Sequence, residues 1–151
     1  MCKDIHDDLL INVQDQKIKK GSIPLHEGEV CNKLWVLADG LLRSYHMIGH
    51  KEVTSRIMFT NHIVISPGSF FMQTPATESI EALADCTVAA LSFSALQDIY
   101  KKFPEFNYHS RIITEQYFYK QEQRLYMLRR RDDEAKYKFF VEKIGKSKRL
   151  N

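Results

Sequence analysis

The chain has 151 residues, 44% of them hydrophobic, and a formal net charge of +3 at pH 7. This length supports one sizeable hydrophobic core with an appended helical piece and leaves little room for two full domains. No run approaches the ~20 apolar residues that span a bilayer, and the start MCKDIHDDLL lacks the pattern of a secretory signal, so we expect a cytoplasmic protein without membrane contact.

The charge is unevenly distributed along the chain. Residues 1–123 hold 12 Lys and Arg against 15 Asp and Glu, a balance of −3, whereas residues 124–151 hold 10 against 4, a balance of +6. A basic end suits an acidic partner such as nucleic acid, although such runs are more often solvated helix faces or tails. The three cysteines, at positions 2, 31 and 86, are too widely spaced to indicate a zinc site or a disulfide framework.

The first half of the chain has the pattern of short β-strands. Five of the six glycines lie within the first 68 residues, at the intervals that separate turns in an all-β domain. The segment KLWVLADGLL predicts a strand that packs Trp35 and ends in a turn at Asp39 and Gly40. Two further strands are predicted on either side of the hairpin turn MIGHK. In LLRSYHM the side chains alternate between the two faces of the strand, and in VTSRIMF the alternation places Val53, Ser55, Ile57 and Phe59 on one face. The segments SIEAL and CTVAALSF predict two more strands.

The pattern changes to helix after residue 93. Ser94 is a candidate N-cap for ALQDIYKKF, and Pro104 suits the first turn of a second helix that no proline or glycine interrupts before residue 145. Asp132 or Asp133 can cap a further helix through YKFFVEKI. The long helix has an apolar face wide enough to meet two surfaces, and we expect it to form a homodimer through Phe106, Ile113, Tyr117, Phe118, Leu125 and Leu128. The alternative is one wide core-facing helix in a monomer.

Two segments resemble a known family. KKGSIPLHEGEVCNKLWVLADGLLRSY, residues 19–45, and ESIEALADCTVAALSFSALQDIYKKFPEF, residues 78–106, resemble the CRP/FNR transcription regulators in the order of their turns, strands and helix. The resemblance implies a mainly β fold with flanking helices, a jelly-roll sensor domain of the cyclic-nucleotide-binding type over residues 1–103. It also implies a dimerisation helix over residues 104–131 and a truncated remnant over residues 132–151.

The resemblance also bears on the ligand. Relatives that bind cyclic AMP hold its phosphate with an arginine and backbone amides, and its ribose with a Gly-Glu pair. In this sequence the arginine position falls on Ala76 and the following hydroxyl position on Thr77, and no Gly-Glu pair precedes them. The amides of Gly68, Ser69 and Phe70 after Pro67 form a candidate anion nest. Glu78 and Glu81 oppose a phosphate, because they add negative charge nearby.

Three occupants of the barrel stay open: a cyclic nucleotide, a different small molecule, and the protein's own side chains, with Phe70, Phe71 and Met72 as plugs. We favour the last two over a cyclic nucleotide. The residues that would line a ligand pocket are Ser66, Gly68, Ser69, Phe70, Phe71, Thr74, Ala76, Thr77 and Ser79.

Other site chemistry finds little support. Three scattered cysteines cannot supply the four ligands of an iron-sulfur cluster, and His46, His50 and Glu52 around the hairpin turn lack the paired H-x-H spacing of a metal site. No nucleophile elbow or phosphate loop occurs. We therefore expect no cofactor, no metal and no enzymatic activity.

In the family a winged helix-turn-helix follows the dimer helix, whereas the resemblance here stops before IGKSKRLN. We expect no sequence-specific DNA binding by this chain alone. Three functional classes remain: a ligand-sensing dimeric module, the N-terminal part of a transcription regulator, and an interaction protein that competes for dimerisation with complete relatives.

Overall fold

The computed structural model describes residues 3–129, 134, 137–138 and 141–142. It comprises two compact units, Met1–Lys102 and Phe103–Asn151.

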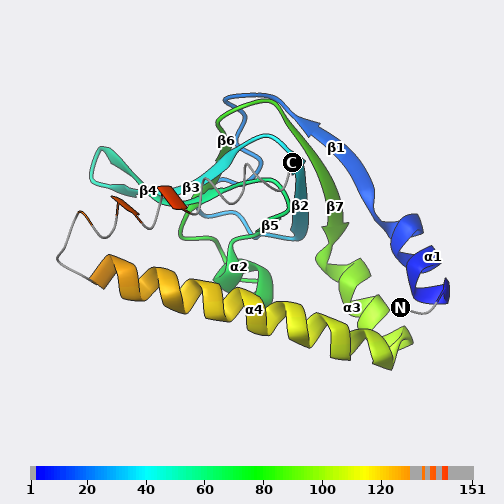
Figure 1. Cartoon of the computed structure of the whole chain (residues 1–151). Helices are drawn as coiled ribbons and strands as arrows, with labels where there is room; N and C mark the ends of the chain where they lie inside the picture. Colours follow the sequence, from blue (N-terminus) through cyan, green and yellow to red (C-terminus); the bar gives the residue numbers. More distant parts are fainter. Residues whose placement is uncertain (1–2, 130–133, 135–136, 139–140, 143–151) are drawn as a thin grey trace. The chain divides into compact units, whose positions relative to one another are not determined.

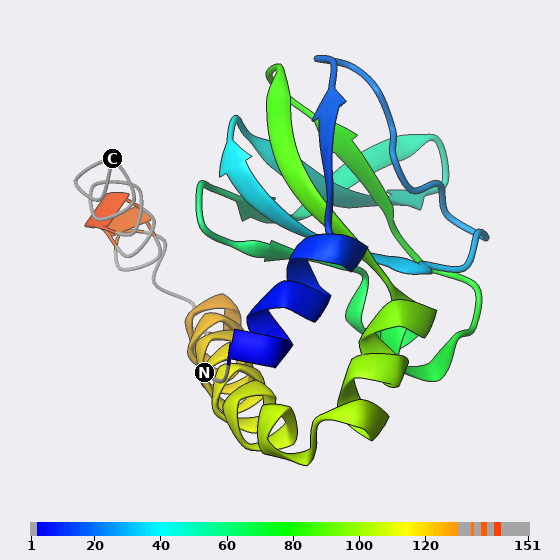
Figure 2. The same cartoon turned by 90° about the vertical axis from the view of Figure 1, so that its right-hand side faces the viewer.

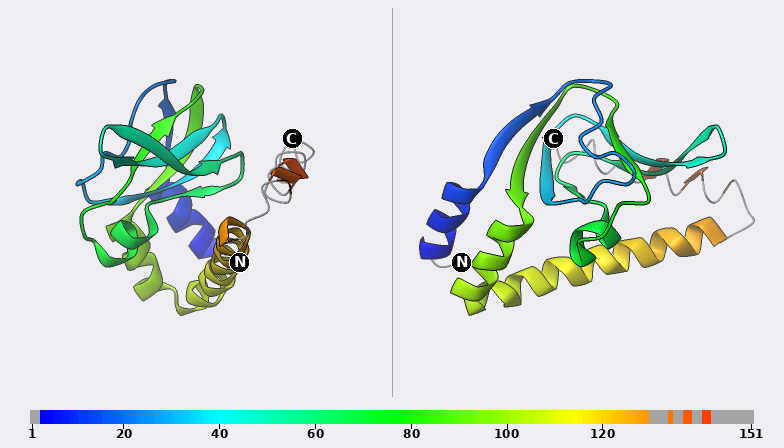
Figure 3. Two further views of the ribbon diagram at one scale, coloured as in Figure 1. Left: turned by 90° about the vertical axis from the view of Figure 1, so that its left-hand side faces the viewer. Right: turned by 180° about the vertical axis from the view of Figure 1, so that it is seen from behind.

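The first unit is built from two antiparallel sheets that face each other (Figure 1). The four-stranded sheet has the order β1 (Gln14–Ile18), β7 (Cys86–Ser92), β2 (Lys33–Asp39) and β5 (Ile63–Val64). The three-stranded sheet has the order β4 (Lys51–Met58), β3 (Leu42–Ile48) and β6 (Ser79–Ala82). The predicted mainly β fold with flanking helices is confirmed, and each of the five predicted strands is present. The short strands β1 and β5 are additional, and Figure 3 shows β1 alongside β7.

The core lies between the two sheets because alternate residues of each strand point inward. Leu37, Val64 and Val88 from the four-stranded sheet and Leu42 and Ile80 from the other are almost completely buried. Trp35 is buried as predicted. Fully burying side chains of this size contributes about 1.5–3 kcal/mol each to folding.

Two helices flank the sheets and lie side by side (Figure 2): α1 (Lys3–Asn12) and α3 (Phe93–Lys102). Ile5 of α1 and Ile99 of α3 are both buried, and Lys102 Nζ of α3 lies 2.7 Å from Asp8 Oδ1 of α1. Helix α1 was not anticipated from the sequence.

The predicted N-cap of α3 is wrong by two residues. The Oγ of Ser92, not of Ser94, accepts the backbone N–H of Ala95 at 3.1 Å, and Ser94 lies within the first turn. The cap is the last residue of β7, because the helix starts directly after that strand.

One predicted strand face is also wrong. The pairing of β3 with β4 shifts between Ser44 and Tyr45, so that Ser44 lies opposite Arg56 while Tyr45 lies opposite Thr54. Ser55 is thus the extra residue of a β-bulge, which reverses the alternation that follows it. As a result Arg56 shares a face with the buried Ser44, and Ile57 is exposed.

The second unit consists mainly of α4 (Pro104–Arg129), which begins at the predicted proline. The proposed caps Asp132 and Asp133, and most of the segment 132–151, lie outside the described residues. No helix among the residues that the structure describes is long and apolar enough to cross a membrane.

The turn between β2 and β3 tolerates only glycine. Gly40 has a φ of +116°, and a Cβ at this position would lie 2.6 Å from Cys86 Sγ and 2.7 Å from the carbonyl oxygen of Asp85. Gly28 also has a positive φ, +90°, but nothing lies within 4 Å of its would-be Cβ. A side chain at Gly28 would therefore meet backbone strain alone, whereas a side chain at Gly40 would meet both strain and steric overlap.

We expect Gly40→Ala to lower the free energy of unfolding by about 3 kcal/mol, because it combines backbone strain with overlap in the β2–β3 turn. Gly28→Ala, the matched control, should cost about 1–2 kcal/mol from strain alone. Urea denaturation followed by circular dichroism measures both changes, and equal losses for the two variants would contradict the steric argument.

Candidate functional site

The predicted ligand segment folds as a short helix followed by a tied-down loop. Helix α2 (Pro67–Met72) starts after Ser66, which has extended backbone angles, and ends at Gln73, which is left-handed with φ of +52°. Pro67 at the first helical position favours this start because its φ is preset. Gln73 Nε2 closes the end of the helix by donating to the carbonyl oxygen of Phe70 at 2.7 Å.

Phe70 is the residue of α2 that fills the core. It is buried, and its ring packs edge-to-face against Phe93, with centroids 5.4 Å apart. Phe71 and Met72 are 53% and 73% exposed, so the prediction that they plug the barrel is wrong. The helical period of α2 directs only one of three consecutive apolar residues inward.

Two of the predicted pocket serines use their hydroxyls to hold a loop. Ser69 Oγ accepts the backbone N–H of Cys31 at 2.8 Å and donates to the carbonyl oxygen of Thr74. Ser79 Oγ accepts the backbone N–H of Glu27 at 2.9 Å. These hydroxyls therefore fasten the loop between β1 and β2 to α2 and β6.

The nine predicted pocket residues differ in their exposure to solvent. Gly68, Phe71, Thr74 and Thr77 are exposed, whereas the other five are buried: Ser66, Ser69, Phe70, Ala76 and Ser79. Ala76, at the arginine position of the resemblance, exchanges backbone hydrogen bonds with Gly28 and Glu29. In the predicted anion nest, the amide of Phe70 already donates to the carbonyl oxygen of Ser66.

A largely buried ion pair lies next to the segment that leads into α2. The Nη2 of Arg56 lies 2.7 Å from Glu78 Oε1 and 2.9 Å from the carbonyl oxygen of Ile65, and its Nε donates to Ser44 Oγ at 3.3 Å. The side chains of Arg56 and Glu78 are only 10% and 15% exposed. The negative charge that the sequence places here at Glu78 is thus neutralised by Arg56.

Glu81 does not contribute to this site. Its Oε2 accepts a hydrogen bond from Arg43 Nε at 2.8 Å, and Arg43 also contacts Glu52 and Thr54. Its neighbours in β6, Ile80 and Ala82, are the buried ones, so Glu81 points to the outer face of the sheet. The hydrogen bond to Glu52 is the main cause that raises the pKa of Arg43 above its usual value.

The motif of His46, His50 and Glu52 is dispersed among separate contacts. His46 Nδ1 lies 3.0 Å from Ser55 Oγ, His50 is exposed in the hairpin turn, and Glu52 is paired with Arg43. The three side chains therefore do not converge on one point at which they could bind a metal ion together.

Cys31 lies in the loop between β1 and β2, and its thiol is close enough to Arg56 and Glu78 to be affected by their charges. Burial is the main cause that raises the pKa of its thiol, and Glu78 raises that pKa further while Arg56 lowers it. The thiol donates to the carbonyl oxygen of Lys33 at 3.3 Å. It therefore stays protonated at neutral pH and serves as a small apolar core group.

The sequence model of the cyclic nucleotide-binding domain matches residues 15–103. The chain belongs to this family. A cyclic nucleotide-binding domain is a regulatory module and not an enzyme, in agreement with the expectation of no catalysis. No curated protein matched the chain.

Solved structures of similar fold come from regulators of two kinds. The catabolite activator protein of Thermus thermophilus is 16% identical, with a TM-score of 0.67 over 85% of this chain and 60% of its own. A variant of CooA from Carboxydothermus hydrogenoformans is 19% identical, with a TM-score of 0.64 over 92% of this chain and 88% of its own. The regulatory domain of Toxoplasma gondii PKA, crystallised with cAMP, is 14% identical, with a TM-score of 0.59 over 66% of this chain and 38% of its own.

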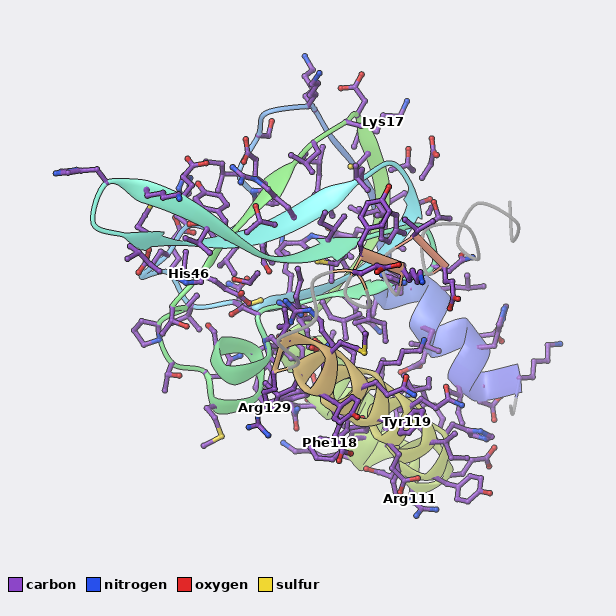
Figure 4. The ribbon with its side chains drawn as sticks, turned by 60° about the vertical axis from the view of Figure 1, so that its left-hand side comes forward. Lys17, His46, Arg111, Phe118, Tyr119 and Arg129 are labelled. Atoms are coloured by element: carbon purple, nitrogen blue, oxygen red, sulfur yellow. The ribbon has the colours of Figure 1, made fainter. Side chains whose placement is uncertain are left out.

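The helix that follows the cyclic nucleotide-binding domain has no buried residue. Of its six predicted dimer residues, Phe106 and Tyr117 are partly exposed, and the other four are 45–70% exposed: Ile113, Phe118, Leu125 and Leu128. Phe118 and Tyr119 are labelled on this helix in Figure 4. Within its own unit, among the described residues, α4 has no second long helix against which to bury these side chains.

We expect Arg56→Met to lower the free energy of unfolding by about 3 kcal/mol, because it leaves the carboxylate of Glu78 buried without its partner. The double variant Arg56→Met with Glu78→Leu should recover most of this loss, since no buried charge remains. Arg111→Met, which breaks the exposed pair with Glu115, is the control and should change stability by less than about 0.5 kcal/mol. Urea denaturation measures the free energy of unfolding of each variant. A loss in the double variant equal to the sum of the losses in Arg56→Met and Glu78→Leu would contradict the pairing.

Proposed function

We propose that this chain is the sensor domain of a CRP/FNR-type transcription regulator, that it dimerises through α4, and that its barrel does not bind cyclic AMP. The observation that carries the last point is the buried pair of Arg56 and Glu78 beside the α2 segment. The family match and the folds of similar regulators support the first point.

Electrostatics around α2 oppose the binding of cyclic AMP. A buried phosphodiester needs positively charged or N–H donors, because an uncompensated charge in the core costs several kcal/mol. Ala76 offers only a methyl group at the position that the resemblance gives to an arginine. Arg56 is the buried guanidinium nearby, but it is already bound to Glu78, Ile65 and Ser44. An incoming phosphate would have to displace the carboxylate of Glu78 and leave it buried and unpaired.

The exposed apolar side chains of α4 favour dimerisation. Phe106 and Ile113 are seven residues apart, and so are Phe118 and Leu125, so each pair repeats one position along the helix. The two pairs lie about 120° apart around the helix axis and mark the two edges of one wide apolar face. A second copy of the helix related by a twofold axis supplies the same face in return. In such a dimer the state of the barrel would be relayed through the segment from Pro104 to Arg131.

A second function, a dimerisation module without any ligand in the barrel, is favoured by the burial of Phe70 and of the Arg56–Glu78 pair. DNA binding and the choice of target genes would be functions of a complete regulator, and we do not propose them for this chain alone.

We expect isothermal titration calorimetry with cyclic AMP and cyclic GMP to give no binding with a dissociation constant below about 100 µM. The regulatory domain of Toxoplasma gondii PKA, crystallised with cAMP, is the positive control under the same conditions. A micromolar dissociation constant for this chain would contradict the electrostatic argument.

We expect sedimentation equilibrium to give twice the chain mass of 17.7 kDa at about 100 µM protein, because pairing of two copies buries the apolar face of α4. Phe118→Glu with Leu125→Glu should shift the chain to a monomer, since each places a charge in the paired face. Ile11→Glu, at a position of α1 that is 79% exposed, is the matched control and should leave the dimer intact. A wild-type monomer at this concentration would refute dimerisation.

A further inference from the structure

One side chain bonds to both ends of the segment that contains α2. The Nη2 of Arg56 lies 2.9 Å from the carbonyl oxygen of Ile65 and 2.7 Å from Glu78 Oε1. Ile65 directly precedes segment 66–77, and Glu78 directly follows it. A single guanidinium nitrogen therefore ties the two ends of this segment to β4, the strand to which Arg56 belongs.

Segment 66–77 has little apolar burial of its own. Helix α2 has six residues, fewer than the ~12–15 that an isolated helix needs for even marginal stability in water. The side chains of Phe70 and Ala76 are buried, whereas Phe71 and Met72 are exposed. Burial of one aromatic ring and one methyl group is small beside the conformational entropy that is lost when the whole segment is ordered. The bonds at the two ends of the segment are therefore important for its order.

Hydrogen bonds also join the segment to the loop between β1 and β2. Ser69 Oγ accepts the backbone N–H of Cys31, and Gln73 Nε2 donates to the carbonyl oxygen of Cys31 at 3.2 Å. The backbone N–H of Ala76 donates to the carbonyl oxygen of Glu29 at 2.8 Å. A loop is a weaker support than a sheet, because loops open at a lower free energy than core strands. The loop and the segment can thus move together while the sheets stay paired.

Glu78 has an advantage over any free anion because it belongs to the same chain as Arg56. A tethered group acts at an effective concentration of the order of millimolar or higher, and a free anion has to compete with that. Both side chains are largely buried, so a separated pair would leave two poorly hydrated charges. A guanidinium that loses its carboxylate in such a place favours another anion in the same position.

We propose that Glu78 supplies a tethered anion to Arg56, that this ion pair holds segment 66–77 in place without an effector, and that the segment opens as one unit, with the sheets still folded, when the carboxylate is removed. Once the carboxylate is absent, Arg56 becomes a site for a small carboxylate of the size of acetate. In the wild-type chain Glu78 fills that site. A change in the state of α2 then requires an event that separates the pair.

Chymotrypsin digestion of the full-length native protein tests the opening. Cleavage within α2, after Phe70, Phe71 or Met72, requires local opening, because a protease needs an extended and accessible backbone. Cleavage after Trp35 reports unfolding of the four-stranded sheet, since β2 lies between β7 and β5. Mass spectrometry of the fragments distinguishes the two cuts.

We expect Glu78→Ala to speed cleavage within α2 by about tenfold or more, because Arg56 then has no carboxylate to bind. Opening of one segment exposes little surface, so this rate should stay nearly constant up to about 1 M urea, whereas cleavage after Trp35 should rise steeply. A common, steep urea dependence of the two rates would mean that the pair only stabilises the domain as a whole.

Acetate tests whether Arg56 accepts a free carboxylate. Sodium acetate at about 100 mM, in place of sodium chloride, should slow cleavage within α2 of Glu78→Ala by about threefold or more, because it returns a carboxylate to the guanidinium. Acetamide, the neutral analogue, should not slow it. In the wild-type chain acetate should change the rate by less than about twofold, since Glu78 already occupies Arg56.

Two further variants locate the effect. Glu81→Ala is the matched control, because Glu81 pairs with Arg43 on the outer face of the same sheet, and it should change cleavage within α2 by less than about twofold. The double variant Arg56→Met with Glu78→Ala has no guanidinium, so acetate should not protect it. If Glu78→Ala fails to fold, as its circular dichroism would reveal, Glu78→Gln decides, because it keeps the shape and removes the charge.

Three results would overturn the proposal: unchanged cleavage within α2 after loss of the Glu78 charge, a common urea dependence of the two cuts, or equal protection of Glu78→Ala by acetate and acetamide. None of these measurements involves a nucleotide or the dimer. Failure here therefore leaves the proposed function standing, and the calorimetry and sedimentation experiments can fail without affecting this inference.

Discussion

The interior of the barrel depends on one irregularity in strand pairing, the β-bulge at Ser55. Without the extra residue, Ile57 would lie inside the sheet and Arg56 outside. The bulge turns the guanidinium of Arg56 toward Ser44 and the carbonyl oxygen of Ile65, where it meets the carboxylate of Glu78. A single inserted residue thereby replaces an apolar side chain by a charged one, and the fold then requires a buried counter-charge.

This pair changes what the domain can recognise. The fold is shared with a PKA regulatory domain crystallised with cAMP and with CooA, a CO-dependent transcription factor, so the ligand has to be inferred from the side chains in place. In this chain the positive and negative charges near α2 compensate each other within the protein.

The fold could be predicted largely from sequence because its signals are local. Glycine spacing, two-residue alternation and Pro104 each report on a few neighbouring residues, and they located five strands and the long helix. Helix α1 was not predicted because only one of its four apolar residues, Ile5, is buried, and the helix that lies beside α1 comes some ninety residues later in the sequence. The two-residue strand β5 is too short to show any period.

The site was predicted less well because its geometry is set by distant pairing. The bulge is defined by the register of β3 against β4, so no alternation within VTSRIMF reveals that Arg56 faces inward. For Glu81 the alternation of SIEAL carried a usable signal, since the residues on both sides of it are apolar. The roles of Ser69 and Ser79 depend on amides some 40 to 50 positions earlier in the chain, which no local pattern discloses.

Those same serine contacts have a consequence for motion. The amides of Glu27 and Cys31 belong to a loop, yet each donates to a hydroxyl held by α2 or β6. The amide protons of loops normally exchange with solvent quickly, but these two are expected to exchange when their hydrogen bonds to the serine hydroxyls break. Their exchange rates therefore follow the opening of the α2–β6 region and not that of the loop in which they lie, so two protons in the β1–β2 loop report on the stability of a neighbouring element.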